Sequence, residues 1–250
     1  MIYNTNDSPF HPLESYDFNL SVWLSHWYPL ICDYLKMDAN NDYYALKSIL
    51  ARTKSNVNRD TLSKIIKENN VCIIAPGPSL EKNLDFLKTI AKNHILLAID
   101  GATQFLIEKE IFPSVIVSDF DGDINAQLLA QKRGAILLLH IHGDNLHTIN
   151  KYINKFRQYN FVITTQTRPL EGSFNFLGFS DGDRAVCFSH LMHAKEILLV
   201  GFDFGNEIGR YSKLFPLSLV QQEKKFKKFV IAKSIINWCA NNNAMIKIRN

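Results

Sequence analysis

The sequence predicts an α/β protein with a doubly wound, mostly parallel sheet that is flanked by helices and preceded by a helical N-terminal region. Three observations predict this class. Short apolar runs begin at residue 71, amphipathic stretches alternate with them, and the first 68 residues hold no strand-like run. Most of the runs lack polar/apolar alternation, which is typical of strands covered on both faces. Strands that alternate with helices in this way indicate βαβ units.

Residues 1–68 are expected to form the helical region and residues 69–250 an α/β catalytic domain. Apolar residues recur at helix-like spacing between residues 18 and 30, between 43 and 50, and between 62 and 66. We expect this region to cover the core or to make a homo-oligomer contact. The polar residues 53–58 are the best linker candidate, and Asp60 is a candidate cap for the next helix.

The expected strands and helices alternate along the rest of the chain. The strand-like runs are 71–75, 95–99, 114–117, 135–139, 161–164, 197–200 and 245–248. The helix-like segments lie near 80–92, 102–110, 124–133, 145–157, 183–194 and 220–242. In the last run Lys247 stands between two isoleucines, which favours an edge strand. The last helix is rich in lysine (Lys224, Lys225, Lys227 and Lys228), and most of these are expected on a solvated face.

Composition and charge exclude several classes of protein. A net charge of +4 is compatible with an anionic small molecule and too weak to indicate nucleic acid without a basic stripe. The four cysteines show no CxxC spacing and are expected to be reduced thiols in the core. The polar start predicts no signal peptide, and no apolar run approaches the roughly 18 residues of a membrane span. We therefore expect a cytoplasmic protein with no membrane partner.

The most informative feature is the acidic run of residues 118–123, which follows a strand-like segment. Its three carboxylates repel one another unless a cation or a charged ligand neutralises them. On an extended backbone, Asp119 and Asp121 lie about 6–7 Å apart on one side, within reach of one hard cation. Such an oxygen-rich site suits Mg²⁺ that carries substrate phosphates. A solvated Asp/Gly turn is the alternative.

Other chemistry-bearing residues also follow the predicted strands, where open α/β sheets bind their ligands. These candidates are Gly77, Pro78, Ser79, Asp100, Gly101, His142, Asp144, Asn145, Thr165, Thr167 and Asp203. A structural protein needs good turns at strand ends, but it has no reason to gather so many carboxylates along one edge.

Two segments combine a helix start with residues suited to an anion. Gly77 permits a tight turn, and Ser79 can cap a helix that starts near residue 80, where free N–H groups favour an anion. A plain strand–turn–helix connection is the alternative. Arg184 falls in the first turn of a helix that begins near Asp183, where the helix dipole disfavours a cation. A phosphate or carboxylate partner would explain it, and Asp181 or Asp183 can cap the same helix.

Two further types of site are disfavoured. His140 and His142 share a face if their strand continues, but no third His or Cys stands nearby, so the Asp residues favour magnesium over zinc. The alternative to a functional role is that these histidines simply pack at a strand end. The chain has no GxSxG elbow and no Walker A motif, which argues against a hydrolase triad and a P-loop.

Several of these segments resemble, in order and spacing, the archaeal-type 6-hydroxymethyl-7,8-dihydropterin pyrophosphokinases. The matching segments are 75–80, 100–102, 118–123, 142–145, 178–185, 201–205 and 209–213, within roughly residues 70–245. The acidic run and the Asp-Gly-Ala turn also resemble thiamine pyrophosphokinases. Those enzymes carry a further β-rich domain that is not seen after residue 200, and they usually have glycine where this chain has Ser118.

The resemblance implies that ATP transfers its terminal diphosphate to the hydroxymethyl group of the pterin and releases AMP, in folate or methanopterin biosynthesis. It implies that Asp119 and Asp121 hold Mg²⁺, supported by Asp100 and Asp144, and that Arg184 and Lys213 bind phosphates. The expected ligand contacts are Gly77, Pro78, Ser79, Asp100, Gly101, His142, Asn145, Thr165, Thr167 and Asp181. Asp203 is expected to contact the ligand or to act as a base on the hydroxyl group.

Three other functions remain open at this point. Thiamine diphosphokinase is the first, and a nucleotide-sugar-dependent glycosyltransferase related to surface glycosylation is the second, because some such enzymes carry a similar Gly-Pro-Ser-Leu turn. The third is a non-catalytic nucleotide-binding module. The many carboxylates argue against the module, since they repel a polyphosphate unless a metal intervenes.

Overall fold

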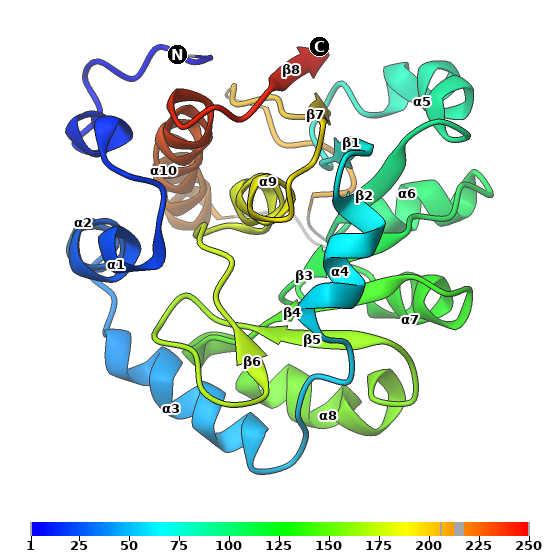
Figure 1. Ribbon diagram of the computed structural model, residues 1–250, viewed down its shortest axis with the longest axis horizontal. Helices are drawn as coiled ribbons and strands as arrows, with labels where there is room; N and C mark the ends of the chain where they lie inside the picture. The colour runs from blue at the N-terminus through cyan, green and yellow to red at the C-terminus, as the bar shows by residue number, and fades with distance from the viewer. Residues whose placement is uncertain (1, 206, 213–217, 250) are drawn as a thin grey trace.

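An eight-stranded sheet with helices on both faces forms the centre of the molecule (Figure 1). The computed structural model describes residues 2–205, 207–212 and 218–249. Within them the strand order is β6-β5-β4-β3-β2-β1-β7-β8, and all neighbouring strands are parallel. The predicted fold class is confirmed, and the sheet is wholly rather than mostly parallel over these residues.

The strands match the apolar runs closely. They are β1 (Asn70–Ile74), β2 (Ile95–Ile99), β3 (Val115–Ser118), β4 (Ile136–His140), β5 (Phe161–Thr164), β6 (Ser173–Phe174), β7 (Glu196–Val200) and β8 (Ile246–Arg249). β8 lies at an edge, as Lys247 indicated, and alternates half-buried with exposed residues. The sequence prediction missed β6 at the other edge, because two residues are too few to show a period.

The helices also follow the predicted segments. The α-helices are α1 (Leu20–Val22), α2 (Tyr28–Leu35), α3 (Ala39–Leu50), α4 (Arg59–Ile66), α5 (Leu84–Ile90), α6 (Ala102–Glu108), α7 (Ile124–Lys132), α8 (Leu146–Phe156), α9 (Asp181–Leu191) and α10 (Leu219–Asn241). The shorter helical turns are η1 (His11–Ser15), the π-helical η2 (Trp23–Trp27), η3 (Glu81–Asn83) and η4 (Gly143–Asn145).

Alternate residues of the strands bury into two different helical layers. Ile73 and Val117 belong to the cluster that contains α9, α10 and the N-terminal helices. Their neighbours Ile74 and Ile116 face the opposite side, in the clusters that contain residues of α5, α6 and α8. Both faces are thus apolar, which explains why the strand sequences read as continuous hydrophobic runs.

The N-terminal region covers the core, which is one of the two roles expected for it. Trp23 and Trp27 are fully buried, and Trp27 packs against Trp238 of α10 with ring centroids 5.0 Å apart. Residues 53–58 form no helix or strand, but Ser55 accepts a hydrogen bond from the Ile163 N–H at 2.8 Å, so they run along β5. The predicted cap of α4 is wrong: Asn58, not Asp60, accepts from the Thr61 N–H.

Two expectations from composition can be compared with the described residues. All four cysteines are buried and free, as predicted; the sulfur atoms of Cys187 and Cys239 approach to 3.5 Å. None of the described helices combines the length and the apolar character needed to cross a membrane.

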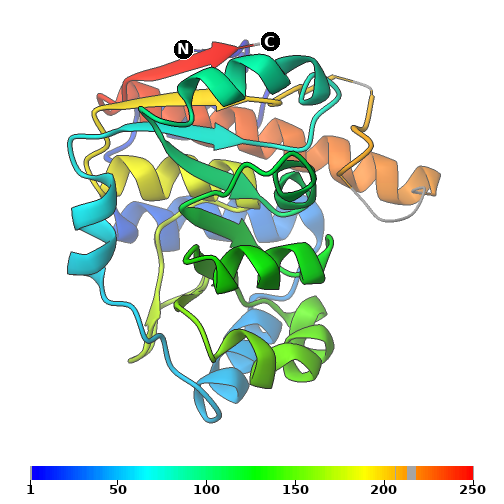
Figure 2. The same ribbon diagram turned by 90° about the vertical axis from the view of Figure 1, so that its right-hand side faces the viewer.

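The strand order determines where a ligand can enter. β1 pairs with β2 on one side and with β7 on the other, so the direction of winding reverses between β1 and β7. At such a switch point the loops after the strands diverge and leave a crevice at the carboxyl edge of the sheet. The first turns of α10 extend past this edge (Figure 2).

Candidate active site

A cavity of about 430 Å³ opens at the carboxyl edge of the sheet. This volume lies within the range of small-molecule sites. Residues that follow β1, β2, β3, β4, β5 and β7 line it, together with the start of α9 and the first half of α10. The site therefore draws on segments from most of the chain, as the distribution of candidates at the predicted strand ends indicated.

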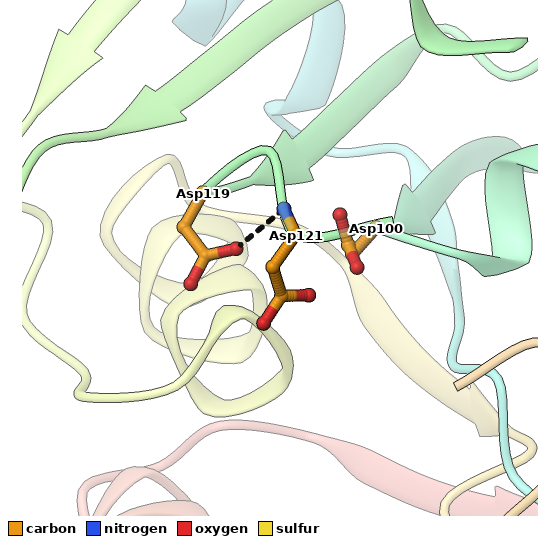
Figure 3. A group of neighbouring side chains, drawn as sticks. All are labelled: Asp100, Asp119 and Asp121. Atoms are coloured by element: carbon orange, nitrogen blue, oxygen red, sulfur yellow. Dashed lines mark hydrogen bonds between the residues drawn. The ribbon is translucent and has the colours of Figure 1, made fainter. Parts of the chain in front are cut away.

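Three carboxylates gather in this cavity (Figure 3). Asp100, Asp119 and Asp121 each offer an oxygen atom, and these three atoms lie within 4.8 Å of one another. Asp119 and Asp121 leave the loop after β3 on the same side, and the Asp121 N–H donates to Asp119 Oδ1 at 3.2 Å. A set of hard anionic oxygen atoms at this separation is the donor set that Mg²⁺ prefers.

The third carboxylate of the acidic run has a different role. Asp123 caps α7, because its Oδ1 accepts from the N–H groups of Asn125 and Ala126 at 2.9 and 3.2 Å. For Asp123, the alternative interpretation of the acidic run as a turn is therefore right, since this residue starts a helix. It does not belong to the three-carboxylate cluster.

Neighbouring groups hold Asp100 in a buried position. Its Oδ1 accepts from Ser118 Oγ at 2.7 Å, from Gln127 Nε2 at 2.9 Å and from the Gly122 N–H at 3.2 Å. A Cβ atom at Gly122 would meet Asp100 Oδ2 at 2.7 Å, so the loop approaches this closely only with glycine. Ser118 therefore orients a carboxylate of the cluster.

The loop after β4 holds Asp119 from the other side. The Asp144 N–H donates to His142 Nδ1 at 3.3 Å, so the ring proton is on Nε2, which lies 3.3 Å from Asp119 Oδ2. Asn145 donates to the carbonyl groups of Asp119 and His140 at 2.9 and 2.7 Å. His142 and Asp144 line the cavity, whereas Asn145 is buried behind it.

The start of α9 faces the carboxylates across the cavity. Burial, with added repulsion from Asp119 and Asp100, raises the pKa of Asp181 well above its usual range. Burial also raises the pKa of Asp183 to about 6, although the Arg184 charge acts in the opposite direction. Neither residue caps the helix as predicted, because Ser180 is the cap residue and α9 begins at Asp181. The cavity thus carries an excess of acidic groups that a bound cation would relieve.

Arg184 does not line the cavity, in contrast to its predicted phosphate contact. The side chain is completely buried and donates to the carbonyl groups of Thr165, Leu177 and Phe179 and to His140 Nε2, at 3.2 to 3.5 Å. Burial together with the Arg184 charge lowers the pKa of His140 well below its usual range, so His140 is a neutral acceptor. The geometry gives Arg184 a structural role behind the cavity wall.

The Gly-Pro-Ser segment packs against the end of β7. A Cβ atom at Gly77 would meet the Gly201 carbonyl oxygen at 2.2 Å and Asp203 Oδ2 at 2.4 Å, so the close approach is to protein atoms. The predicted capping by Ser79 is wrong, since Leu80 precedes η3 and makes no side-chain cap. Ser79 instead donates through its N–H and its hydroxyl group to Asp203 Oδ2, each at 2.7 Å.

The remaining candidates divide between the cavity and the framework behind it. Pro78 and Asp203 line the cavity, whereas Gly101 packs against Tyr211. Thr165 and Thr167 are buried, and their hydroxyl groups bond to each other at 3.0 Å. Lys213 lies outside the described residues.

Several residues that line the cavity were not among the candidates. Lys224, Lys225 and Lys228 line the cavity. Lys224 is exposed, as expected for a solvated face, whereas Lys225 and Lys228 are half-buried. Gln166 also lines the cavity, between the two threonines that were predicted. A signal for Gln166 was present in the strand period. Val162 of β5 faces the layer of α9 and α10, and if the alternation continues past the end of β5, residue 166 faces the same side.

Comparison with known proteins gives consistent matches. Residues 47–209 match the family described as 6-hydroxymethylpterin diphosphokinase MptE-like. A Pyrococcus furiosus protein named 6-hydroxymethyl-7,8-dihydropterin pyrophosphokinase is 38% identical over 79% of this chain and 83% of its own length. Proteins of the same name from Methanocaldococcus jannaschii and Methanothermobacter thermautotrophicus are 37% and 31% identical, over 72% and 89% of this chain and 78% and 96% of their own lengths.

A solved structure of the MAf glycosyltransferase from Magnetospirillum magneticum aligns with a TM-score of 0.43 and 13% identity. The alignment covers 75% of this chain and 30% of the other chain. A likeness at this level supports no conclusion about function.

Proposed function

Because the chain belongs to the MptE-like family of 6-hydroxymethylpterin diphosphokinases, we propose that it transfers the terminal diphosphate of ATP to 6-hydroxymethyl-7,8-dihydropterin and releases AMP. The observation that carries the proposal is the cluster of Asp100, Asp119 and Asp121 in a cavity that lysines also line. The product would feed the synthesis of folate or of methanopterin-type cofactors.

The residues present fit a magnesium ion. Three carboxylate oxygens within 4.8 Å of one another are hard donors. Burial, with added repulsion from Asp119 and Asp100, raises the pKa of the nearby Asp181. When bound, Mg²⁺ would neutralise charge on the transferred diphosphate. His142 and Ser118 would then act as positioning residues, since they hold Asp119 and Asp100.

The transfer makes one bond and breaks one. The hydroxymethyl oxygen of the pterin bonds to the β-phosphorus of ATP, the bond from that phosphorus to the oxygen bridging it to the α-phosphorus breaks, and AMP leaves with this oxygen. Asp203 is our candidate acceptor for the hydroxyl proton, because it lines the cavity and two donors from Ser79 orient it. An Asp203→Ala variant with unchanged turnover and KM would exclude this role.

The proposal is tested by incubating the protein with ATP, Mg²⁺ and the dihydropterin and measuring AMP and pterin diphosphate by chromatography. We expect the two products in equal amounts and none after removal of the metal with a chelator. Thiamine in place of the pterin is the control for the related diphosphokinase. AMP formation with thiamine and not with the pterin would overturn the proposed substrate.

The α10 lysines are expected to bind the phosphates of ATP. Lys228 lines the cavity, whereas its neighbour Lys227 forms a surface ion pair with Glu223 at 3.0 Å. Lys228→Met should therefore raise the KM for ATP about tenfold, the effect of losing a charged hydrogen bond of about 1.4 kcal/mol. The KM for the pterin should stay within about twofold. Lys227→Met is the matched control, and equal effects of the two substitutions would contradict the assignment.

A further inference from the structure

Gln166, which lines the cavity, carries a buried acceptor atom that has no hydrogen-bond partner in the described part of the chain. The residue follows β5, is 2% exposed and lines the cavity. Its Oε1 has no hydrogen-bond partner among the described residues. Most buried polar atoms in proteins are hydrogen-bonded, so an orphaned oxygen on a residue that lines a cavity is a candidate acceptor for a donor on the ligand.

The N-terminal region determines which way this amide points. Gln166 Nε2 donates to Asp42 of α3, a carboxylate that is 3% exposed. Asp42 also accepts from the Tyr28 hydroxyl at 2.7 Å and from the Gly143 N–H at 2.9 Å. Because a carboxylate accepts hydrogen bonds and does not donate them, the amide nitrogen of Gln166 must face Asp42, and the amide oxygen must face away from it.

The main chain of Gln166 is held from the same side. Trp23 Nε1 donates to the Gln166 carbonyl group at 2.8 Å, and Trp23 is completely buried. Met37, from the same N-terminal region, lines the cavity directly. Trp23, Met37 and Asp42 all precede residue 47, where the family match begins.

The surroundings of Gln166 favour a neutral heterocycle with N–H donors. Among the described lining residues, the only Lys or Arg side chains are those of α10, where the phosphates are expected. Gln166 follows β5, two strands from the Asp119 loop and on the side away from β1 and β7. Two strand spacings are about 10 Å, which is comparable to the length of a pterin from its 2-amino group to its hydroxymethyl oxygen.

We propose that Gln166 Oε1 accepts a hydrogen bond from the 2-amino and ring N–H edge of the pterin, and that Asp42 is the positioning residue that orients it. The inference rests on the proposed function. With that edge at Gln166, the hydroxymethyl arm at the opposite end of the ring points toward the carboxylates after β2 and β3. Selectivity for the pterin then depends on the N-terminal helices.

The central test compares Gln166→Met with the wild-type protein in the AMP assay. Met conserves the volume and lacks the acceptor, so the KM for the pterin should rise about tenfold, with the KM for ATP within about twofold. The 6-hydroxymethyl-7,8-dihydrolumazine analogue, which has an oxo group in place of the 2-amino group, should be a poor wild-type substrate. It should lose little further in the variant.

Asp42→Asn provides a sharper test. The Gly143 N–H keeps an oxygen atom on its side of residue 42, so the new amide NH₂ would face Gln166 Nε2. The Gln166 amide must then flip and turn its own NH₂ toward the ligand, so the KM for the pterin should rise by a similar factor. The double variant Asp42→Asn/Gln166→Glu keeps the net charge and restores an acceptor, and it should recover the wild-type KM within about threefold. Tyr28→Phe is the matched control, because it removes a hydrogen-bond partner of Asp42 and leaves the orientation of the Gln166 amide unchanged.

Distinct outcomes separate this inference from the proposed function. If the wild-type protein forms no AMP with the pterin, the proposed function is wrong, and so is the inference that rests on it. An active wild type with an unchanged pterin KM in Gln166→Met overturns the inference alone. A rise in the KM for ATP instead would assign Gln166 to the adenine amino group, and an unrescued double variant would reduce Asp42 to a structural role.

Discussion

Replacing Asp119 or Asp121 by asparagine is expected to lower kcat by about a thousandfold without unfolding the protein. Each substitution keeps the size of the side chain and removes one charge from the three-carboxylate cluster. A bound metal contributes several kcal/mol of charge stabilisation, and each 1.36 kcal/mol corresponds to a tenfold change in rate. The AMP assay at saturating pterin, with circular dichroism as a check of the fold, measures this effect.

Asp123→Asn is the matched control, because it removes the same charge from the same loop. Asp123 caps α7, and asparagine is an equally good cap, so activity should change less than about threefold. Equal losses at positions 121 and 123 would mean that the charge of the loop matters, and not the cluster.

Thermal unfolding gives an independent measurement of the same site. Asp121→Asn keeps the size of the side chain and removes one charge from the three-carboxylate cluster. Added Mg²⁺ should raise the Tm of the wild type, because an ion that binds only the folded state stabilises it. This shift should shrink in the variant, and an unchanged shift would exclude Asp121 as a ligand.

Arg184→Gln is expected to lower the free energy of unfolding by about 3–5 kcal/mol, the usual cost of removing one partner from a buried charged network. The substitution leaves the carbonyl groups of Leu177 and Phe179 without their charged donor. It also removes the positive charge that opposes the rise in the pKa of Asp181 and Asp183. Urea denaturation of the variant and the wild type measures the difference.

The same variant separates the structural role from the phosphate contact that the sequence predicted. A phosphate ligand would leave stability unchanged and raise the KM for ATP. Arg184→Lys, which keeps the charge but not the planar fork of donors, should give an intermediate loss of stability. A fully stable Arg184→Gln protein would contradict the role that the buried geometry gives this residue.

The sequence by itself determined the architecture and the centre of the site. Strands buried on both faces must be apolar throughout, so β1 to β5 could be recognised in the sequence as apolar runs. Lys247 identified β8 as an edge strand. Carboxylates that follow neighbouring parallel strands must meet at one edge. The grouping of Asp100 with Asp119 and Asp121 was therefore predictable from their positions in the chain.

Only the tertiary structure decided what faces the cavity. A helix start predicts where Arg184 lies along the chain, but the packing of α9 turns its guanidinium into the core. A lysine stripe on α10 is typical of a solvated face, and it lines the cavity because the first turns of the helix extend past the sheet. Gln166 depends on Asp42, which is 124 residues distant in sequence. Local patterns specify periodicity and turns, whereas the direction of a side chain toward a site depends on contacts between segments far apart in the chain.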